Sequence, residues 1–360
     1  MDKESAVRGC LLGLAVGDAM GCPVDKKSWT EICEDYGPNG LLGYDLANGT
    51  ANITSYTQLA AFVANGLLIG TTRGKSDQLE KYIALGLREW AKSQQFRGAT
   101  ERTHCWLAQV ARMRQRQCMD TGLLDALTRE NLGAPERPVV ISNSPSALTS
   151  AVAVALLYDD KRMTYPMIGQ LAARAVAFTH GDPETFLSGA ALAYGLQGIL
   201  EDPEKPVAEH FMKAARTVQL QFGEAYPKAD TVAARIEKAI SLAKDPELTP
   251  LAALSLLGCT TASECLAGAV YAAAIHPANF DEGMISAVNH SGSSCAVACL
   301  TGGILGARLG VEALPEFYLE SLEPIEILSE LAADMVQGGQ FMRLFDADWD
   351  QKYAHGTPVE

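Results

Sequence analysis

The sequence has few basic residues and no long uncharged apolar segment. Its 360 residues include 29 Lys and Arg against 43 Asp and Glu, a formal net charge of −14, and no Lys/Arg-rich tract offsets this charge. A negative field repels phosphate backbones and anionic lipids. No segment approaches the roughly 18 uncharged apolar residues that cross a bilayer. Asp18 follows the apolar run at residues 10–16, and no small-residue cleavage site typical of a secretory signal comes after it. We therefore predict no nucleic-acid partner and no membrane partner.

The cysteines lack a metal-binding pattern. There are nine, an odd number, with no Cys-x-x-Cys pair and no zinc-type spacing of cysteine and histidine. Cysteines of this kind are typical of reduced, mostly buried thiols. We therefore predict a cytoplasmic protein.

Alternating β-branched runs are scarce, whereas long segments are rich in Ala and Leu at three- and four-residue spacing, as at Leu266, Val270 and Ala274. This pattern predicts an all-α protein of about a dozen helices. Helix start signals agree with it at Thr261–Glu264, which has capping-box spacing, and at Asp182, which precedes a proline. No low-complexity linker divides the chain, so we predict one domain over residues 1–345 and a peripheral C-terminal tail over residues 346–360.

One predicted helix, at residues 295–309, is apolar or small on every face. It contains Gly302, Gly303 and Gly306, although each glycine costs a helix about 1 kcal/mol. A helix without a polar face belongs in the centre of a fold. The preceding loop, residues 290–294, should then lie at the mouth of the helical bundle.

Five loop-to-helix junctions combine polar side chains with a helix terminus: residues 13–25, 53–58, 141–146, 178–184 and 290–295. Ser144, which precedes Pro145, places a hydroxyl and backbone N–H groups at the positive end of a helix dipole, a geometry that suits a phosphate. Each junction also has a purely structural interpretation. Asp18 could cap a neighbouring helix, His180 could satisfy a carbonyl, and Ser144 could be only a helix cap.

Taken together, the order of these segments resembles the ADP-ribosylglycohydrolase family, which includes dinitrogenase-reductase-activating glycohydrolase and the ADP-ribosyl-acceptor hydrolases. The resemblance covers about residues 6 to 315 and implies a single compact multi-helix orthogonal bundle. It rests on Gly13-x-x-x-Gly17-Asp18-Ala19-x-Gly21-x-Pro23, Thr179-His180-Gly181, Leu257-Gly258 followed by residues 264–271, Val288-Asn289-His290-x-Gly292, and Gly302-x-Ile304-x-Gly306-Ala307.

The sequence departs from this family at the magnesium site. The family binds two magnesium ions through Thr-Asp-Asp-Thr and Gly-Asp-x-Asp-Ser/Thr segments, which this sequence aligns with residues 54–57 and 292–296. Magnesium prefers charged oxygen ligands, and the aspartates are replaced. The resemblance therefore implies no magnesium cofactor and no metal at the degenerate positions Thr54, Ser55, Tyr56, Ser293 and Cys295.

What remains of the family's pocket is a set of groups that could hydrogen-bond ADP-ribose without a metal. The resemblance places in it the ligand-binding candidates Asp25, Asn143, Ser144, His180, His290 and Gly292. Asp25 stands where the family has a glutamate at the entrance of the active site. A metal-free glycosidase would need two acidic groups about 5–9 Å apart, and Asp18, Asp25 and Asp182 are the candidates by position. A thiolate dyad of His290 and Cys295 is disfavoured, because glycosidic cleavage does not require a thiol.

Three functions are consistent with these features. The first is a family member that has lost magnesium-dependent hydrolysis and binds ADP-ribose, an ADP-ribosylated protein or an ADP-ribosyltransferase, in the last case as an immunity protein. The second is an active metal-independent hydrolase that cleaves an N- or O-glycosidic bond of ADP-ribose. The third is a structural or regulatory scaffold that binds no nucleotide.

Overall fold

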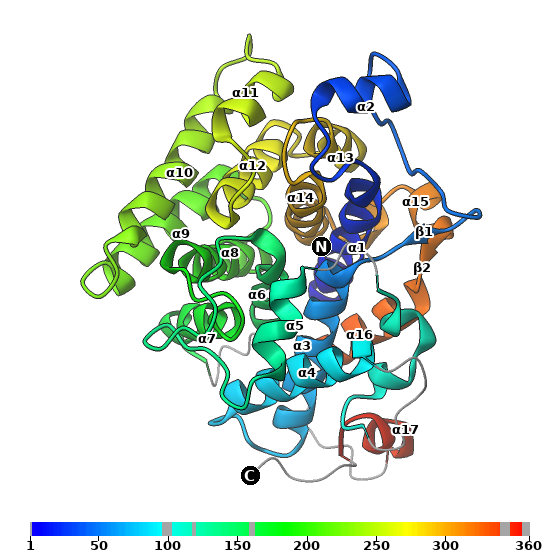
Figure 1. The fold of residues 1–360 in the computed structure, drawn as a ribbon, viewed down its shortest axis with the longest axis vertical. Coiled ribbons are helices and arrows are strands. Elements are labelled where there is room, and N and C mark those ends of the chain that lie inside the picture. The colour runs from blue at the N-terminus through cyan, green and yellow to red at the C-terminus, as the bar shows by residue number, and fades with distance from the viewer. Residues whose placement is uncertain (1, 96–102, 117–119, 158–162, 339–345, 355–360) are drawn as a thin grey trace.

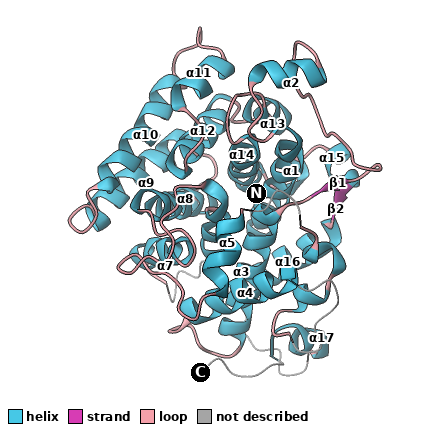
Figure 2. Ribbon diagram, in the orientation of Figure 1, coloured by secondary structure: helices cyan, strands magenta, loops and turns pink. Residues whose placement is uncertain are grey.

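The computed structural model describes residues 2–95, 103–116, 120–157, 163–338 and 346–354, and these residues are mostly helical (Figures 1 and 2). The predicted all-α class is confirmed. Two short parallel strands, β1 (Ala51–Asn52) and β2 (Leu322–Glu323), pair at the periphery. The principal helices are α1 (Lys3–Gly21), α2 (Trp29–Tyr36), α3 (Ser55–Thr72), α4 (Leu79–Gln95), α5 (Thr121–Thr128), α6 (Thr149–Leu156), α7 (Tyr165–Ala177), α8 (Pro183–Glu201), α9 (Val207–Phe222), α10 (Lys228–Leu242), α11 (Pro250–Leu257), α12 (Ala262–Ile275), α13 (Phe280–Val288), α14 (Ser294–Leu309), α15 (Glu316–Ser321) and α16 (Ile325–Gln337).

The centre of the fold is the antiparallel pair α1 and α14, which lie side by side in Figure 1. Every residue of α14 from Ser294 to Ala307 is buried, as predicted for the glycine-containing helix. Small residues let the two backbones approach closely. A methyl group on Gly13 would overlap the carbonyl oxygen of Gly302, and one on Gly17 would overlap that of Ala298. Glycine is therefore required where the two backbones touch.

Helix α1 is more apolar than the sequence analysis allowed. Together with the short helical turn that follows it, residues 3–24 are long and apolar enough to cross a membrane by length and composition, contrary to the prediction that no segment approaches this limit. Of the apolar window, 83% is buried inside the protein. The reason is that α1 packs against α14, α16 and α3, which together leave it almost no solvent-exposed face.

The helix start signals identified in the sequence are present. Asp182 caps α8, accepting a hydrogen bond from the Thr185 N–H at 3.2 Å, and Pro183 occupies the first turn. At α12, the Glu264 carboxylate accepts from the Thr261 N–H at 3.0 Å, as a capping box requires. These local patterns fix the ends of helices whose N-termini line the site described below.

The cysteines follow the sequence prediction with one exception. Six of the free thiols are buried, Cys33 being the half-buried seventh, and burial raises the pKa of the Cys10 and Cys259 thiols to about 12. Cys22 is instead disulfide-bonded, so the prediction that all nine cysteines are reduced is wrong there. Cys22 lies just after α1, where it is partly buried against the core, whereas the free thiols other than Cys33 are fully buried.

The C-terminal segment is not peripheral as far as it is described. We expected a tail from residue 346, but Trp349 and Tyr353 are buried. The Trp349 ring N–H donates to Thr72 Oγ1 at 3.1 Å, and the Tyr353 hydroxyl donates to Asp334 Oδ2 at 2.6 Å. Lys352 also pairs with Asp334, at 3.0 Å. The segment therefore ties α3 to α16, and its charged residues have partners there that the local sequence does not reveal.

Replacing Tyr353 by phenylalanine should lower the free energy of unfolding by about 1–3 kcal/mol. The substitution leaves the buried Asp334 carboxylate without its hydroxyl donor and removes the acceptor of the Trp106 ring N–H. Urea denaturation measures the change. Tyr36→Phe is the matched control, because the Tyr36 hydroxyl donates to the exposed Asp45 carboxylate, and its loss should cost less than about 0.5 kcal/mol. Equal effects of the two variants would contradict a fixed C-terminal segment.

Candidate functional site

Asp18 holds the N-terminus of α3. Its carboxylate is fully buried and accepts hydrogen bonds from the N–H and hydroxyl groups of both Thr54 and Thr57, at 2.5–3.1 Å. Burial raises the pKa of Asp18, and these four hydrogen bonds oppose that shift. Asp18 is therefore a helix-capping residue, one of the two interpretations left open by the sequence. A fully enclosed carboxylate with this many donors is poorly placed to act on a substrate.

The neighbours of Asp18 are neutral groups, at positions where the resemblance described above implies aspartates. The Cys295 thiol donates to Asp18 Oδ1 at 3.3 Å, and Tyr56 is buried close to Cys295 and Asp25. Burial raises the pKa of both Tyr56 and Cys295 well above their usual values. These two side chains are therefore neutral at pH 7, and Cys295 is a poor nucleophile.

Asp25 caps the N-terminus of α14 in the same way. Its carboxylate accepts a hydrogen bond from the Cys295 N–H at 3.2 Å, and the following Lys26 N–H donates to the Gly292 carbonyl at 2.8 Å. Burial and, to a smaller extent, the charge of Asp18 raise the pKa of Asp25, while the Cys295 N–H and Lys26 oppose the shift. Asp18 and Asp25 thus lie near each other, each at a different helix N-terminus.

This set of donors does not fit magnesium. Asp18 is saturated by hydroxyl and amide donors, Asp25 is engaged by a helix N-terminus, and Tyr56 and Cys295 are uncharged. In the parts of the chain that the structure describes, no three His, Cys, Asp or Glu side chains are grouped so that they could hold a metal ion. The carboxylates that remain are neutralised by hydrogen bonds and helix dipoles instead of a cation.

The loop of residues 142–146 joins two further helix N-termini. The Ser142 carbonyl accepts from the Thr185 hydroxyl of α8 at 3.1 Å, and the Asn143 carbonyl accepts from the Ala262 N–H of α12 at 2.8 Å. The Asn143 side chain is exposed, and it makes no hydrogen bond within the described residues. Ser144 is half-buried, and its hydroxyl donates to the Ser146 oxygen at 3.2 Å. The loop therefore presents an amide and a hydroxyl between α8 and α12.

A third group of polar side chains lies behind this loop. His180 is fully buried, and its Nε2 lies 3.1 Å from Ser146 Oγ and 3.4 Å from Asp120 Oδ2. Ser146 Oγ donates to the same Asp120 oxygen at 2.9 Å. The hydrogen bond from His180 is the main reason that the pKa of Asp120 is well below its usual range. His180 therefore binds a carboxylate, rather than the carbonyl considered from the sequence.

Asp120 and Ser146 were not among the residues predicted for the site. Asp120 has a local signal, since it caps α5 by accepting from the Gly122 N–H at 2.8 Å. Nothing in the local sequence shows that the same carboxylate reaches Ser146 and His180. The Ser146 and Asp120 oxygens both face Nε2, whereas a Ser-His-Asp relay needs the carboxylate on the opposite ring nitrogen. We interpret this group as a link that holds the loop of residues 142–146 in place.

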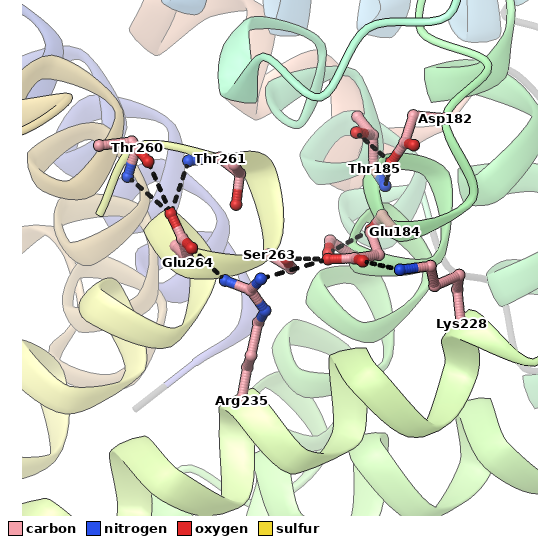
Figure 3. A network of polar contacts seen from close by, with 10 residues as sticks. Asp182, Glu184, Thr185, Lys228, Arg235, Thr260, Thr261, Ser263 and Glu264 are labelled. Atoms are coloured by element: carbon pink, nitrogen blue, oxygen red, sulfur yellow. Dashed lines mark hydrogen bonds and ion pairs between the residues drawn. The ribbon is translucent and has the colours of Figure 1, made fainter. Parts of the chain in front are cut away.

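An ion-pair network on the outer side fixes α8 and α12 relative to each other (Figure 3). Arg235 of α10 lies between Glu184 and Glu264, with a nitrogen 3.5 Å from Glu184 Oε2 and a second in contact with Glu264 at 2.5 Å. Lys228 also pairs with Glu184, at 2.7 Å. Burial raises the pKa of Glu264, but the hydrogen bonds from Arg235 and from Thr260 and Thr261 outweigh it and lower the pKa to about 2. The helix ends that carry Asp182 and Ala262 are thus held by opposite charges.

His290 has an environment unlike that of His180. It is 1% exposed, and within the described residues neither ring nitrogen has a hydrogen-bond partner. Burial lowers the pKa of His290 to about 4. The nearby Ala287 backbone opposes this shift, although neither ring nitrogen makes a hydrogen bond to it. The ring packs against Gly292, where a methyl group would lie 3.0 Å from Nδ1. His290 is therefore neutral and enclosed, as is expected of a packing residue.

The protein should lose stability in acid because of His290. Its pKa is about 4 in the folded protein against 6.5 when unfolded, so above pH 6.5 the ring is neutral in both states and protonation does not oppose folding. As the pH falls from 6.5 towards 4, only the unfolded state binds the proton, and the free energy of unfolding falls by roughly 3 kcal/mol. His290→Phe cannot bind the proton, so urea denaturation at pH 7 and pH 5 should show a smaller pH-dependent loss than in the wild type. An unchanged loss would show that His290 is protonated without penalty.

The structure thus brings most of the predicted site residues together through direct contacts between helix N-termini. The loop of residues 142–146 contacts α8 and α12, and the Ser293 N–H at the start of α14 donates to the Cys259 carbonyl just before α12 at 2.8 Å. Asp25 caps α14, and Asp18 caps α3. Positive dipole ends therefore line one continuous region. Asp18 and His290 are enclosed within it, whereas Asn143, Ser144, Asp25 and Asp182 are at least partly exposed.

Comparisons with known proteins bear on the family and the fold. A family model described as ADP-ribosylglycohydrolase matches residues 1–345. An uncharacterised protein of Archaeoglobus fulgidus is 24% identical over 349 residues, covering 93% of this chain and 97% of its own length. A solved structure described as an ADP-ribosylglycohydrolase-related protein complex superposes with a TM-score of 0.60 at 21% identity, covering 93% of this chain and 98% of the other. The structural similarity supports the fold alone.

Proposed function

The chain belongs to the ADP-ribosylglycohydrolase family, and from this we propose that it binds ADP-ribose, free or attached to a protein, without a metal and without magnesium-dependent hydrolysis. The observation that carries the proposal is that the carboxylates of Asp18 and Asp25 are both engaged in capping helices, α3 and α14 respectively. The sequence resemblance implies that Tyr56 and Cys295 replace aspartates of the family. Magnesium-dependent chemistry therefore has no charged ligand set to support it.

Binding does not need those aspartates. The N-termini of α3, α8 and α14 meet here, but Asp18, Asp182 and Asp25 already cap them, so binding would rest on polar side chains beside the capped helix ends. Asn143 supplies an exposed amide, and Ser144 a half-buried hydroxyl. In this proposal a nucleotide-sized anion is bound, while extended nucleic acid and membrane surfaces are repelled.

The proposal is tested by calorimetry with ADP-ribose in EDTA and again with magnesium. We expect binding with the same affinity in both buffers. Asn143→Ala should weaken binding at least tenfold, about 1.4 kcal/mol, because the side chain has no other role within the described residues. Asn39→Ala, an exposed loop asparagine, is the matched control and should bind normally. Binding that appears only with magnesium would overturn the proposal.

The same protein should not release ADP-ribose from modified arginine or serine. Release in EDTA that Asp25→Asn abolishes would instead show a metal-independent hydrolase, in which Asp25 and Asp182 would be the first acids to examine. If calorimetry gives no heat, binding to an ADP-ribosyltransferase, as an immunity protein would do, or a scaffold role would replace ADP-ribose binding. A pull-down with a transferase as bait separates these last two outcomes.

A further inference from the structure

A cavity lined by none of the candidate site residues combines several cations with apolar side chains. It has a volume of about 540 Å³ and is formed by α4, the end of α7 and the connection between α5 and α6. This volume is in the range of ligand-binding clefts. Ala84, Leu85, Leu132 and Phe178 supply apolar surface. None of the residues predicted for the ADP-ribose site lines this cavity, so it has to be explained separately.

Three of its cations are not neutralised by carboxylates. Lys81 and Arg137 are exposed, and neither side chain has a hydrogen bond or ion pair within the described residues. Arg88 Nη2 donates only to the carbonyls of Arg129 and Glu130, at 3.1 and 2.5 Å. The fourth cation, Arg174, is paired with Glu80 at 3.1 Å. The carboxylates that line the cavity are Glu80 and Glu130, so its four cations still exceed its acidic groups. In a chain of net charge −14, such a local excess of positive charge attracts anions.

The spacing of the cations indicates the shape of the anion. Lys81 and Arg88 are seven residues apart on α4, so they lie on one face and about 10 Å apart along the helix axis. A single phosphate is too small to reach both. A peptide in the extended polyproline II conformation rises about 3.1 Å per residue with three residues per turn, so acidic side chains at every third position lie about 9 Å apart on one side. The spacing of these acidic side chains, about 9 Å, is close to the spacing of Lys81 and Arg88, about 10 Å.

Ion pairs of Arg174 separate this cavity from an adjoining one. Arg174 contacts Glu80 and Glu136, and beyond these side chains lies an adjoining cavity of about 510 Å³ that is lined by Asp77, Glu80 and Glu136. Acidic residues on that side would repel an anionic chain. A bound acidic segment would therefore be confined to the basic part, along α4.

Two segments that line the basic cavity lead directly to residues of the candidate site. The Gly133 N–H donates to the Phe178 carbonyl at 3.2 Å, and the Gly181 N–H donates to the Val140 carbonyl at 2.8 Å. The loop that lines the cavity therefore continues directly to Asn143, and the turn that lines it continues to His180. We propose that this cavity is a docking groove for an extended acidic segment of a partner protein. The proposal does not depend on ADP-ribose binding.

The test uses fluorescence anisotropy with a labelled peptide of four Glu-Ala-Pro repeats and a matched peptide of four Gln-Ala-Pro repeats. The acidic peptide should bind at least tenfold more tightly, and its affinity should fall as salt is raised, because exposed charges are screened within about 8 Å at physiological ionic strength. The double variant Lys81→Glu, Arg137→Glu should bind it at least tenfold more weakly. The control is Arg216→Glu, Lys244→Glu, which reverses two exposed charges elsewhere and should bind normally.

Two results would overturn the docking groove. One is equal affinity of the wild type for the acidic and the neutral peptide, or equal affinity of the two double variants for the acidic peptide when both variants melt at the wild-type temperature. The other is inorganic tripolyphosphate binding as tightly as the acidic peptide, which would show a site for compact anions. Because these measurements contain no ADP-ribose, their failure leaves the proposed function untouched, and failure of ADP-ribose binding leaves the groove untouched.

Discussion

Replacing Gly17 by alanine should destabilise the protein by at least about 3 kcal/mol. The new methyl group would overlap the carbonyl oxygen and carbonyl carbon of Ala298, and neither helix can move away because both are buried on nearly all sides. Forcing an extra group into a packed interior typically costs 1–3 kcal/mol, and more where the contact is with backbone. Alanine's better helix propensity, about 1 kcal/mol, offsets only part of this.

Gly303→Ala on α14 provides the matched control. There the nearest atoms to an added methyl group, on Leu14 and Cys10, lie 3.6–3.9 Å away, at ordinary van der Waals distance. The helix propensity gain then dominates, so this variant should be as stable as the wild type or up to about 1 kcal/mol more stable. Chemical denaturation of both variants measures the difference. Two equal changes would show that α1 and α14 are not in backbone contact at Gly17.

Restoring the family's aspartates should make folding depend on magnesium. In the variant Ser55→Asp, Tyr56→Asp, Ser293→Asp, Cys295→Asp, the new carboxylate at position 295 would lie against the buried Asp18, where the Cys295 thiol now donates at 3.3 Å. An uncompensated buried charge costs about 3–5 kcal/mol. We expect a melting temperature far below that of the wild type in EDTA, recovered by magnesium through preferential binding to the folded state.

Thermal denaturation of both proteins with EDTA, magnesium or sodium chloride of equal ionic strength checks this expectation. The wild-type melting temperature should be the same in EDTA and in magnesium, since Asp18 and Asp25 already have hydrogen-bond donors. If the restored variant also gains magnesium-dependent release of ADP-ribose, the remainder of the pocket is intact. A wild type that magnesium stabilises by several degrees would contradict our account of the site.

Local sequence patterns predicted the helices and the central place of α14, because helix periodicity, caps and glycine content are properties of neighbouring residues. They also predicted that Asp18 could cap a helix, but not which helix, since Thr54 and Thr57 are brought to it only by folding. Asp120 was missed because its partners Ser146 and His180 are distant in sequence.

The C-terminal segment was misjudged for the same reason. Trp349, Tyr353 and Lys352 stand among charged residues, which is typical of a solvated tail. Their contacts are with Thr72 on α3 and with Asp334 on α16, and a local pattern of charges contains no information about either helix.

The central pairing of α1 with α14 joins two helices that are synthesised at very different times. Helix α1 leaves the ribosome well before α14, the helix that covers most of its surface, because α14 begins only at residue 294. At about 5–20 residues per second, roughly 15–60 s pass before α14 has been translated. For that time α1, a helix long and apolar enough to cross a membrane, lacks its main partner, and such long-range pairing is intrinsically slow. Nascent chains that stop before residue 309 should therefore aggregate or remain bound to chaperones.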